Sequence, residues 1–260
     1  MPTATTGSLG WAASQTISST SCAESTRFYA WDISSGQALV ALTATDARFA
    51  IEGGLYSVAT SPSGAVAAVG GATGEIRVVG LPTGAAPALG GKRSAGRPMA
   101  SGGGSSGGGQ AGQIIAGIHT HTESVESLSF HPTVPLMASS SVDGRIGLYD
   151  CARGFAVRKM LEGHNDAVVK IEFVQGLGPQ DAWVLTSCGI DGSLRRWDAR
   201  AGVEIAHLKG HLGGNANEGE GGILGFVQNK NRIVTAGDDG VSLVFELQGA
   251  QATGAGVVSK

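Results

Sequence analysis

Three residues have the side chains of a covalent catalyst. Cys188 is a nucleophile by type, His164 a base and Asp191 an acid that could orient the base. Nucleophilic catalysis needs such a set within hydrogen-bonding reach. His164 and Asp191, however, also fit a structural hydrogen-bond network that repeats along the chain, and Cys188 lies in an apolar strand pattern, where a small thiol fills space. We therefore expect no catalytic residues and no enzyme.

Two histidines, His119 and His121, are close enough in sequence to offer two metal ligands. Zinc sites combine such histidines with cysteines or carboxylates at recognisable spacings, and no cysteine or carboxylate pair stands at such a spacing from these histidines. The sequence Gly90-Gly91-Lys92 is followed by Arg93 and not by a hydroxyl residue, so it is not a phosphate-binding loop. We expect neither a metal nor a cofactor, and we assign the histidine pair to a loop between repeat units.

The elements that would position these residues repeat along the chain. Asp143-Gly144, Asp191-Gly192 and Asp239-Gly240 follow one another at an equal spacing of 48 residues (191 − 143 and 239 − 191). Each pair lies between two short apolar runs, which is the pattern of a hairpin with a two-residue turn. One further apolar run before each hairpin and one after it give four strands per unit, close to the period of roughly 40–45 residues in propeller blades. The sequence predicts an all-β fold of four-stranded antiparallel units.

Residues at fixed positions in these units resemble the WD-repeat β-propeller family. One unit contains Gly163-His164, Ser187, Asp191 and Trp197 in the order that the family uses. The resemblance implies a β-propeller in which a histidine, a strand hydroxyl, the turn aspartate and a tryptophan form a hydrogen-bonded tetrad inside each blade. In this unit the implied tetrad is His164, Ser187, Asp191 and Trp197.

The two neighbouring units carry less regular versions of the same pattern. Their implied tetrad residues are Ser139 and Asp143 in the preceding unit, and His211, Thr235 and Asp239 in the following unit. In the following unit Phe245 replaces the tryptophan and has no donor, so we expect an incomplete tetrad. In the preceding unit Tyr149 stands at that position, and either His119 or His121 supplies the histidine. A buried aspartate of this kind needs hydrogen-bond donors around it.

The repeat predicts one propeller domain over residues 1–247, with approximate blades 1–50, 51–122, 123–166, 167–212 and 213–247. We expect 82–113, which is rich in glycine and serine, to be a flexible insertion. Residues 248–260 make a poor strand and are predicted to be a C-terminal tail. Four units are whole or nearly whole and the first is partial, so we expect that N-terminal blades of a closed ring are lacking.

Composition narrows the classes of partner. The net charge of −3 argues against a nucleic-acid binder, which needs a basic face. The three cysteines have no C-x-x-C spacing, which favours a reducing compartment, the cytoplasm and also the nucleus. The N-terminus lacks the features of a signal peptide, and no run approaches the ~18 apolar residues of a membrane span. We expect a protein or peptide partner, with no membrane and no small-molecule substrate.

Loops of a propeller form its default binding surface. Acidic residues stand on or near the predicted inter-blade loops, and the candidate partner-binding set is Glu52, Glu123, Glu126, Asp166, Glu218 and Glu220. These carboxylates suit a basic peptide. The alternative interpretation is that these acidic residues form an ordinary solvated rim of the propeller and bind no partner.

A narrower resemblance rests on several strings in their joint order. The strings include those at 126–130, 141–150, 166–173, 194–200 and 238–245. Over about residues 52–247 they resemble the C-terminal half of the angio-associated migratory cell protein family and its fungal ribosome-assembly counterpart. That resemblance implies a chaperone that holds the basic N-terminal segment of a large-subunit ribosomal protein. The alternative function is a generic WD-repeat scaffold in a signalling or ubiquitin-ligase complex.

Overall fold

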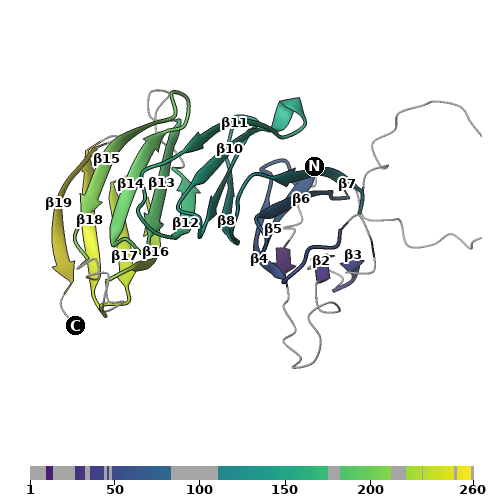
Figure 1. The fold of residues 1–260 in the computed structure, drawn as a ribbon, viewed down its shortest axis with the longest axis horizontal. Helices are drawn as coiled ribbons and strands as arrows, with labels where there is room; N and C mark the ends of the chain where they lie inside the picture. The colour runs from purple at the N-terminus through teal and green to yellow at the C-terminus, as the bar shows by residue number, and fades with distance from the viewer. Residues whose placement is uncertain are drawn as a thin grey trace, which may run out of the picture.

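The protein forms five antiparallel β-sheets that follow one another in chain order along an arc (Figure 1). This architecture comes from a computed structural model that describes residues 10–13, 27–32, 36–43, 46, 49–82, 111–174, 182–211, 221–229, 231–248 and 251–258. The predicted all-β class, with four-stranded antiparallel blades, is confirmed. Within these ranges no helix is long and apolar enough to cross a membrane.

The first sheet has three strands, β1 (Gly10–Ala13), β2 (Arg27–Trp31) and β3 (Ala38–Thr43). The second has β4 (Leu55–Thr60), β5 (Val66–Gly71), β6 (Glu75–Gly80) and β7 (Ile114–His119). The third has β8 (Val125–Phe130), β9 (Leu136–Ser141), β10 (Ile146–Asp150) and β11 (Ala156–Leu161), with the 3-10 turn η1 (Cys151–Arg153) after β10.

The fourth sheet has β12 (Val168–Phe173), β13 (Val184–Gly189), β14 (Ser193–Asp198) and β15 (Val203–Lys209). The fifth has β16 (Ile223–Gln228), β17 (Arg232–Gly237), β18 (Ser242–Gln248) and β19 (Gln251–Val258). In every four-stranded sheet, strands consecutive in sequence are hydrogen-bonded neighbours.

Two strands lie where the sequence pattern gave no strand. β19 pairs with β18 through Leu243↔Val257 and Phe245↔Ala255, so the expectation of a poor strand after Leu247 was wrong. Its glycines and alanines carry little strand signal, and the pairing edge of β18 supplies the backbone partners. β1 likewise pairs with β2 in the N-terminal region where the repeat pattern fades.

The predicted insertion 82–113 falls largely outside the described residues, at 83–110. Its two ends are held together, because Gly80 N donates to Gln113 O at 2.8 Å and Gly112 N donates to Gly80 O at 2.8 Å. The segment therefore leaves and re-enters the second sheet at one point, between β6 and β7.

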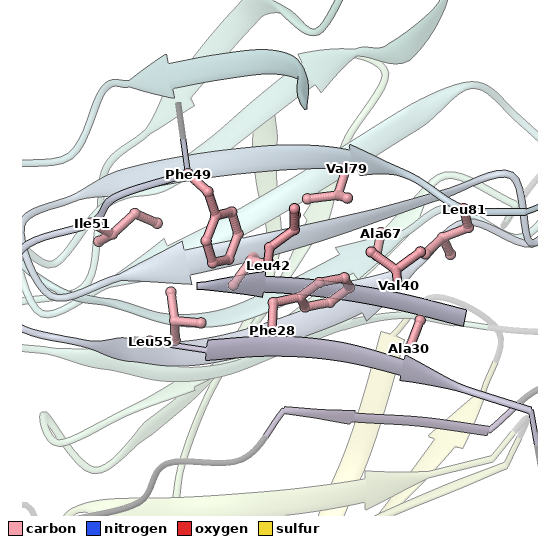
Figure 2. Packing of buried hydrophobic residues seen from close by; sticks show 11 residues of the cluster. Phe28, Ala30, Val40, Leu42, Phe49, Ile51, Leu55, Ala67, Val79 and Leu81 are labelled. Carbon is pink, nitrogen blue, oxygen red and sulfur yellow. The ribbon is translucent and has the colours of Figure 1, made fainter. Parts of the chain in front are cut away.

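Apolar side chains fill the spaces between consecutive sheets. Figure 2 shows the first of these cores, where Phe28 from β2 and Phe49 from the loop before β4 lie with ring centroids 6.1 Å apart. Further clusters join the second sheet to the third, the third to the fourth and the fourth to the fifth. The strands β9 and β13 are buried along their whole length, because a sheet covers each of their faces.

The pairing register places two kinds of connection at opposite ends of the strands. Val125 pairs with Ser141 and Ile146 with Leu161, so the Asp143-Gly144 turn and the connections between sheets lie at the same end. We name this end the turn face. The connections β4–β5, β8–β9 and β10–β11 lie at the other end, which we name the opposite face.

Candidate functional site

A chain of hydrogen bonds crosses the fourth sheet and ends on the turn aspartate. Trp197 Nε1 donates to Ser187 Oγ at 2.8 Å, Ser187 Oγ lies 2.7 Å from His164 Nε2, and His164 Nδ1 lies 3.0 Å from Asp191 Oδ2. A carboxylate only accepts, so Nδ1 carries the proton and Nε2 accepts from the serine hydroxyl. Every donor in the chain then points towards Asp191.

Asp191 collects further donors at the Asp-Gly turn. Its carboxylate accepts from the backbone N–H of Asn165 at 3.1 Å and from Ser193 Oγ at 2.7 Å. Burial raises the pKa of Asp191, but its hydrogen bonds with His164, Ser193 and Asn165 outweigh burial and hold the pKa well below its usual range. Asp191 is therefore a fixed anion that ties the 161–168 connection to the turn after β13.

The third sheet carries the same network with a phenol in place of the indole. Tyr149 OH lies 2.9 Å from Ser139 Oγ, Ser139 Oγ lies 2.7 Å from His121 Nε2, and His121 Nδ1 lies 2.9 Å from Asp143 Oδ2. Thr120 Oγ1 lies 2.6 Å from Tyr149 OH and extends the network by one hydroxyl. The histidine of this sheet is therefore His121.

His119 takes no part in that network. It is exposed, and its Nδ1 lies 3.6 Å from Glu75 Oε1. His121 is buried and has both ring nitrogens engaged. The two histidines therefore do not converge, and no group of three metal-binding side chains occurs among the residues that the structure describes.

The fifth sheet has three members of the network. His211 Nε2 lies 2.7 Å from Thr235 Oγ1, and His211 Nδ1 lies 3.0 Å from Asp239 Oδ2. Phe245 is buried at the position of the tryptophan and has no donor for the threonine hydroxyl.

Cys188 does not meet His164. Neighbouring residues of a strand point to opposite faces, so Ser187 faces His164 while Cys188 packs with Ile223 and Phe226 of the fifth sheet. Burial raises the pKa of the Cys188 thiol to about 12. Because the thiolate is the nucleophile, this geometry does not assemble the catalytic set that the sequence suggested.

A groove of about 510 Å³ opens on the turn face between the third and fourth sheets. Its lining residues are Thr122, Glu123, Val142, Asp143, Gly144, His164, Asn165 and Asp166. Three of them are acidic and none is lysine or arginine. Asp143 is committed to His121, whereas Glu123 and Asp166 are exposed to solvent.

The turn residues fix the walls of this groove. Thr122 N donates to Asp143 Oδ2 at 3.1 Å, and Ser141 Oγ donates to Glu123 O at 3.0 Å. Gly144 at the turn has a φ of +76°, a backbone conformation that favours glycine. At the matching turn of the second sheet, Gly74 has a φ of +80°, and any Cβ there would overlap the carbonyl oxygen of His121. The glycines therefore let the turns approach the next connection closely.

The other acidic candidates have different positions. Glu126 is half-buried on β8, where its Oε1 accepts from Ser124 Oγ at 2.5 Å. Glu52 is exposed before β4, outside the residues that line the groove. Glu218 and Glu220 lie outside the described residues.

A sequence signal for the groove was present and missed. Glu123 and Asp166 each stand two residues after a network histidine, His121 and His164. Since each histidine is anchored to its turn aspartate, the same offset places both acids on the turn face. The uncharged lining residues, such as Asn165, carry no such signal.

Acidification should destabilise the protein. Burial lowers the pKa of His121 and of His131, so the folded state prefers the neutral imidazoles. The unfolded state binds protons first as the pH falls below about 6.5, and each unit of lowered pKa removes about 1.4 kcal/mol of stability. Urea unfolding should show a lower midpoint at pH 5.5 than at pH 7.5. An equal midpoint at both pH values would contradict the assignment of buried neutral histidines.

The repeats and the fold have counterparts among known proteins. Residues 112–150 and 155–198 match the family described as WD domain, G-beta repeat. The chain is a WD40 repeat protein.

Its relatives include an angio-associated migratory cell protein and the fungal protein Sqt1. The angio-associated migratory cell protein of Pongo abelii is 26% identical over 221 residues, which are 84% of this chain and 44% of the relative. A crystal structure of Chaetomium thermophilum Sqt1 bound to the N-terminus of the ribosomal protein L10 superimposes on this chain with a TM-score of 0.69 and 42% sequence identity. The match covers 85% of this chain and 53% of the Sqt1 chain. Saccharomyces cerevisiae Sqt1 is 25% identical, with a TM-score of 0.62, over 87% and 54%. The chain thus spans about half the length of these relatives.

Proposed function

We propose that this chain is a non-catalytic, protein-binding WD40 propeller that acts as a ribosome-biogenesis chaperone, holding the basic N-terminal segment of a large-subunit ribosomal protein. The groove on the turn face carries this proposal, because Glu123 and Asp166 face solvent there without a lysine or arginine in the lining. The similarity to Sqt1, whose structure contains the N-terminus of ribosomal protein L10, supports it.

The charge of the groove is available to a partner. Arg145, which directly follows the Asp143-Gly144 turn, has its Nε 3.4 Å from Glu162 Oε1, an acid outside the groove lining. The two groove carboxylates are therefore not neutralised by lining residues. Exposed carboxylates of this kind accelerate encounter with a basic segment, and each contributes roughly 0.2–1 kcal/mol to the complex, screened by salt.

A chaperone needs an interaction that RNA can displace. A basic segment held by exposed carboxylates is shielded from other anions, and the dense phosphates of RNA compete for the same cations. Release on the precursor particle then requires no energy source. We place this exchange in the cytoplasm or nucleus, where reducing conditions suit the free Cys151 and Cys188.

The proposal is tested by calorimetric titration with a peptide of the basic N-terminal segment of ribosomal protein L10. Combining Glu123→Gln with Asp166→Asn should weaken binding about tenfold at low salt, because two exposed ion pairs are lost. The difference should shrink as the salt concentration rises.

A control variant distinguishes the loss of acidic residues in the groove from the loss of an acidic residue elsewhere on the surface. Glu52→Gln removes an exposed acid outside the groove, and it should change the affinity by less than about twofold. If the double variant binds the peptide as tightly as the wild type, the groove is not the binding site.

A further inference from the structure

The opposite face carries a pocket of about 470 Å³ between the second and third sheets. The β4–β5 and β8–β9 connections form most of its wall, with Ile115 of β7 and with Cys151 and Phe155 beside the end of β10. The six residues of β9 separate it from the Asp-Gly turn, a distance of about 20 Å at the rise of an extended strand. The acidic groove and this pocket are therefore separate surfaces.

The groove lining includes acidic residues, whereas the pocket is lined by uncharged residues. Its lining contains no aspartate, glutamate, lysine or arginine. The large apolar residues of the wall are Val66, Ile115, Phe130, Val134, Leu136 and Phe155, and its prolines are Pro62, Pro132 and Pro135. Proline fixes the backbone and removes an N–H donor, so these connections present pre-formed apolar walls.

His131, the one titratable ring in this wall, is held neutral. Its Nδ1 accepts from the backbone N–H groups of Thr133 and Val134 at 3.1 and 3.0 Å, and its Nε2–H donates to Ala182 O at 2.7 Å. Protonation of Nδ1 would break both accepted bonds. The pocket therefore stays uncharged at neutral pH.

A strained residue completes the wall. Phe155 has a φ of +63°, and the preceding Gly154 has a φ of +64°. Aromatic residues rarely adopt this conformation, and such outliers persist where surrounding structure enforces them, often at binding sites. The Phe155 N–H is bonded to Asp150 O at 2.9 Å, and the ring packs in the buried cluster with Met137 and Tyr149. The strained backbone holds the Phe155 side chain in the lining of the pocket.

We propose that this pocket docks a short uncharged peptide segment of a partner protein through one large aliphatic or aromatic side chain. Charge complementarity selects this occupant, because a cation placed here would lose hydration and gain no anion. The basic segment of the turn face is therefore excluded.

The shape of the pocket favours a peptide over an enclosed small molecule. Pro62, Thr133 and Pro135 are exposed at its edge, so the wall accepts a side chain projected from a chain outside. The protein would then hold a basic segment on one face and an uncharged segment on the other.

Methyl NMR of the full chain tests this assignment with both surfaces in one sample. The probe is a capped pentapeptide with a central leucine between glycine and serine residues, and its matched control has a central lysine. The leucine peptide should shift the methyl signals of Ile115 and Val134, which line the pocket, and leave that of Val142, which lines the groove. The lysine peptide should leave Ile115 and Val134 unshifted.

Two surface variants make the test specific. Ile115→Lys places an ammonium group in the pocket wall and should weaken binding of the leucine peptide by about tenfold. Val157→Lys is the control, because Val157 is also an exposed strand residue, at 48% against 38% for Ile115, and does not line the pocket. It should leave the affinity unchanged.

The remaining outcomes overturn the proposal. Unshifted Ile115 and Val134 signals at millimolar leucine peptide, or equal binding by the Ile115→Lys variant, would show that the pocket is not a peptide site. Equal shifts from N-acetyl-leucinamide alone would assign it to small apolar ligands instead. Failure of the L10 peptide to bind the turn face would leave this result untouched, since the two surfaces have separate reporters.

Discussion

Replacing Ser139 by alanine should lower the free energy of unfolding by about 2–4 kcal/mol, whereas the same change at the adjacent Ser140 should not lower it. Both serines are fully buried on β9. Ser139 Oγ joins His121 Nε2 to Tyr149 OH, so its loss leaves two buried polar groups without that partner. Each such group costs about 1–3 kcal/mol.

Ser140 is the matched control for this prediction. Its Oγ makes no hydrogen bond within the described part of the chain, so removing it breaks no interaction while the strand, burial and side-chain volume stay the same. Urea unfolding of the two variants gives the comparison directly. Equal losses of stability would mean that the hydroxyl network contributes nothing beyond packing.

Reversing the charge of the groove should strongly weaken peptide binding. In the double variant Glu123→Lys with Asp166→Lys, two attractive carboxylates in the lining of the groove become two repulsive ammonium groups. We expect the affinity for the L10 N-terminal peptide to fall by about a hundredfold at low salt, because each reversal removes one favourable pair and adds an unfavourable one.

The reversal should not disturb the fold. Glu123 and Asp166 are exposed, and exposed substitutions usually change stability by less than about 0.5 kcal/mol. Glu52→Lys combined with Glu246→Lys, which replaces two exposed acids outside the groove lining, gives the same change in net charge and should reduce the affinity by less than about threefold. A similar loss in this control would mean that overall charge, and not the groove, governs binding.

The hydrogen-bond networks connect the folding of the blades to the proposed binding site. His121 and His164 anchor the connections that carry Glu123 and Asp166. The backbone of the groove is consequently already fixed in the free protein. Binding therefore loses little conformational entropy in the groove itself. A variant such as Ser139→Ala should therefore affect peptide binding as well as stability.

The sequence predicts the repeated part of this architecture well. Asp-Gly pairs at equal spacing require tight turns, and the residue types at fixed offsets place His164, Ser187 and Asp191 correctly in one network. These features are local, because turn chemistry and strand alternation act over a few residues.

The remaining features depend on contacts that no local pattern contains. β19 exists because β18 offers it a backbone edge. Either His119 or His121 fits the repeat spacing, and only the strand register decides between them. The groove and the pocket each combine connections from two sheets, and the positive φ of Phe155 is set by its surroundings. Sequence reasoning thus finds acids on loops but does not find which of them line one groove.

The central claim is that the acidic groove recognises a particular basic segment. The most direct measurement is the affinity of the chain for the N-terminal peptide of ribosomal protein L10, beside a scrambled peptide of equal composition, at moderate salt. We predict that the natural sequence binds at least about tenfold more tightly, because the spacing of its cations must match Glu123 and Asp166. Equal affinity for both peptides, or binding of neither, would contradict the account.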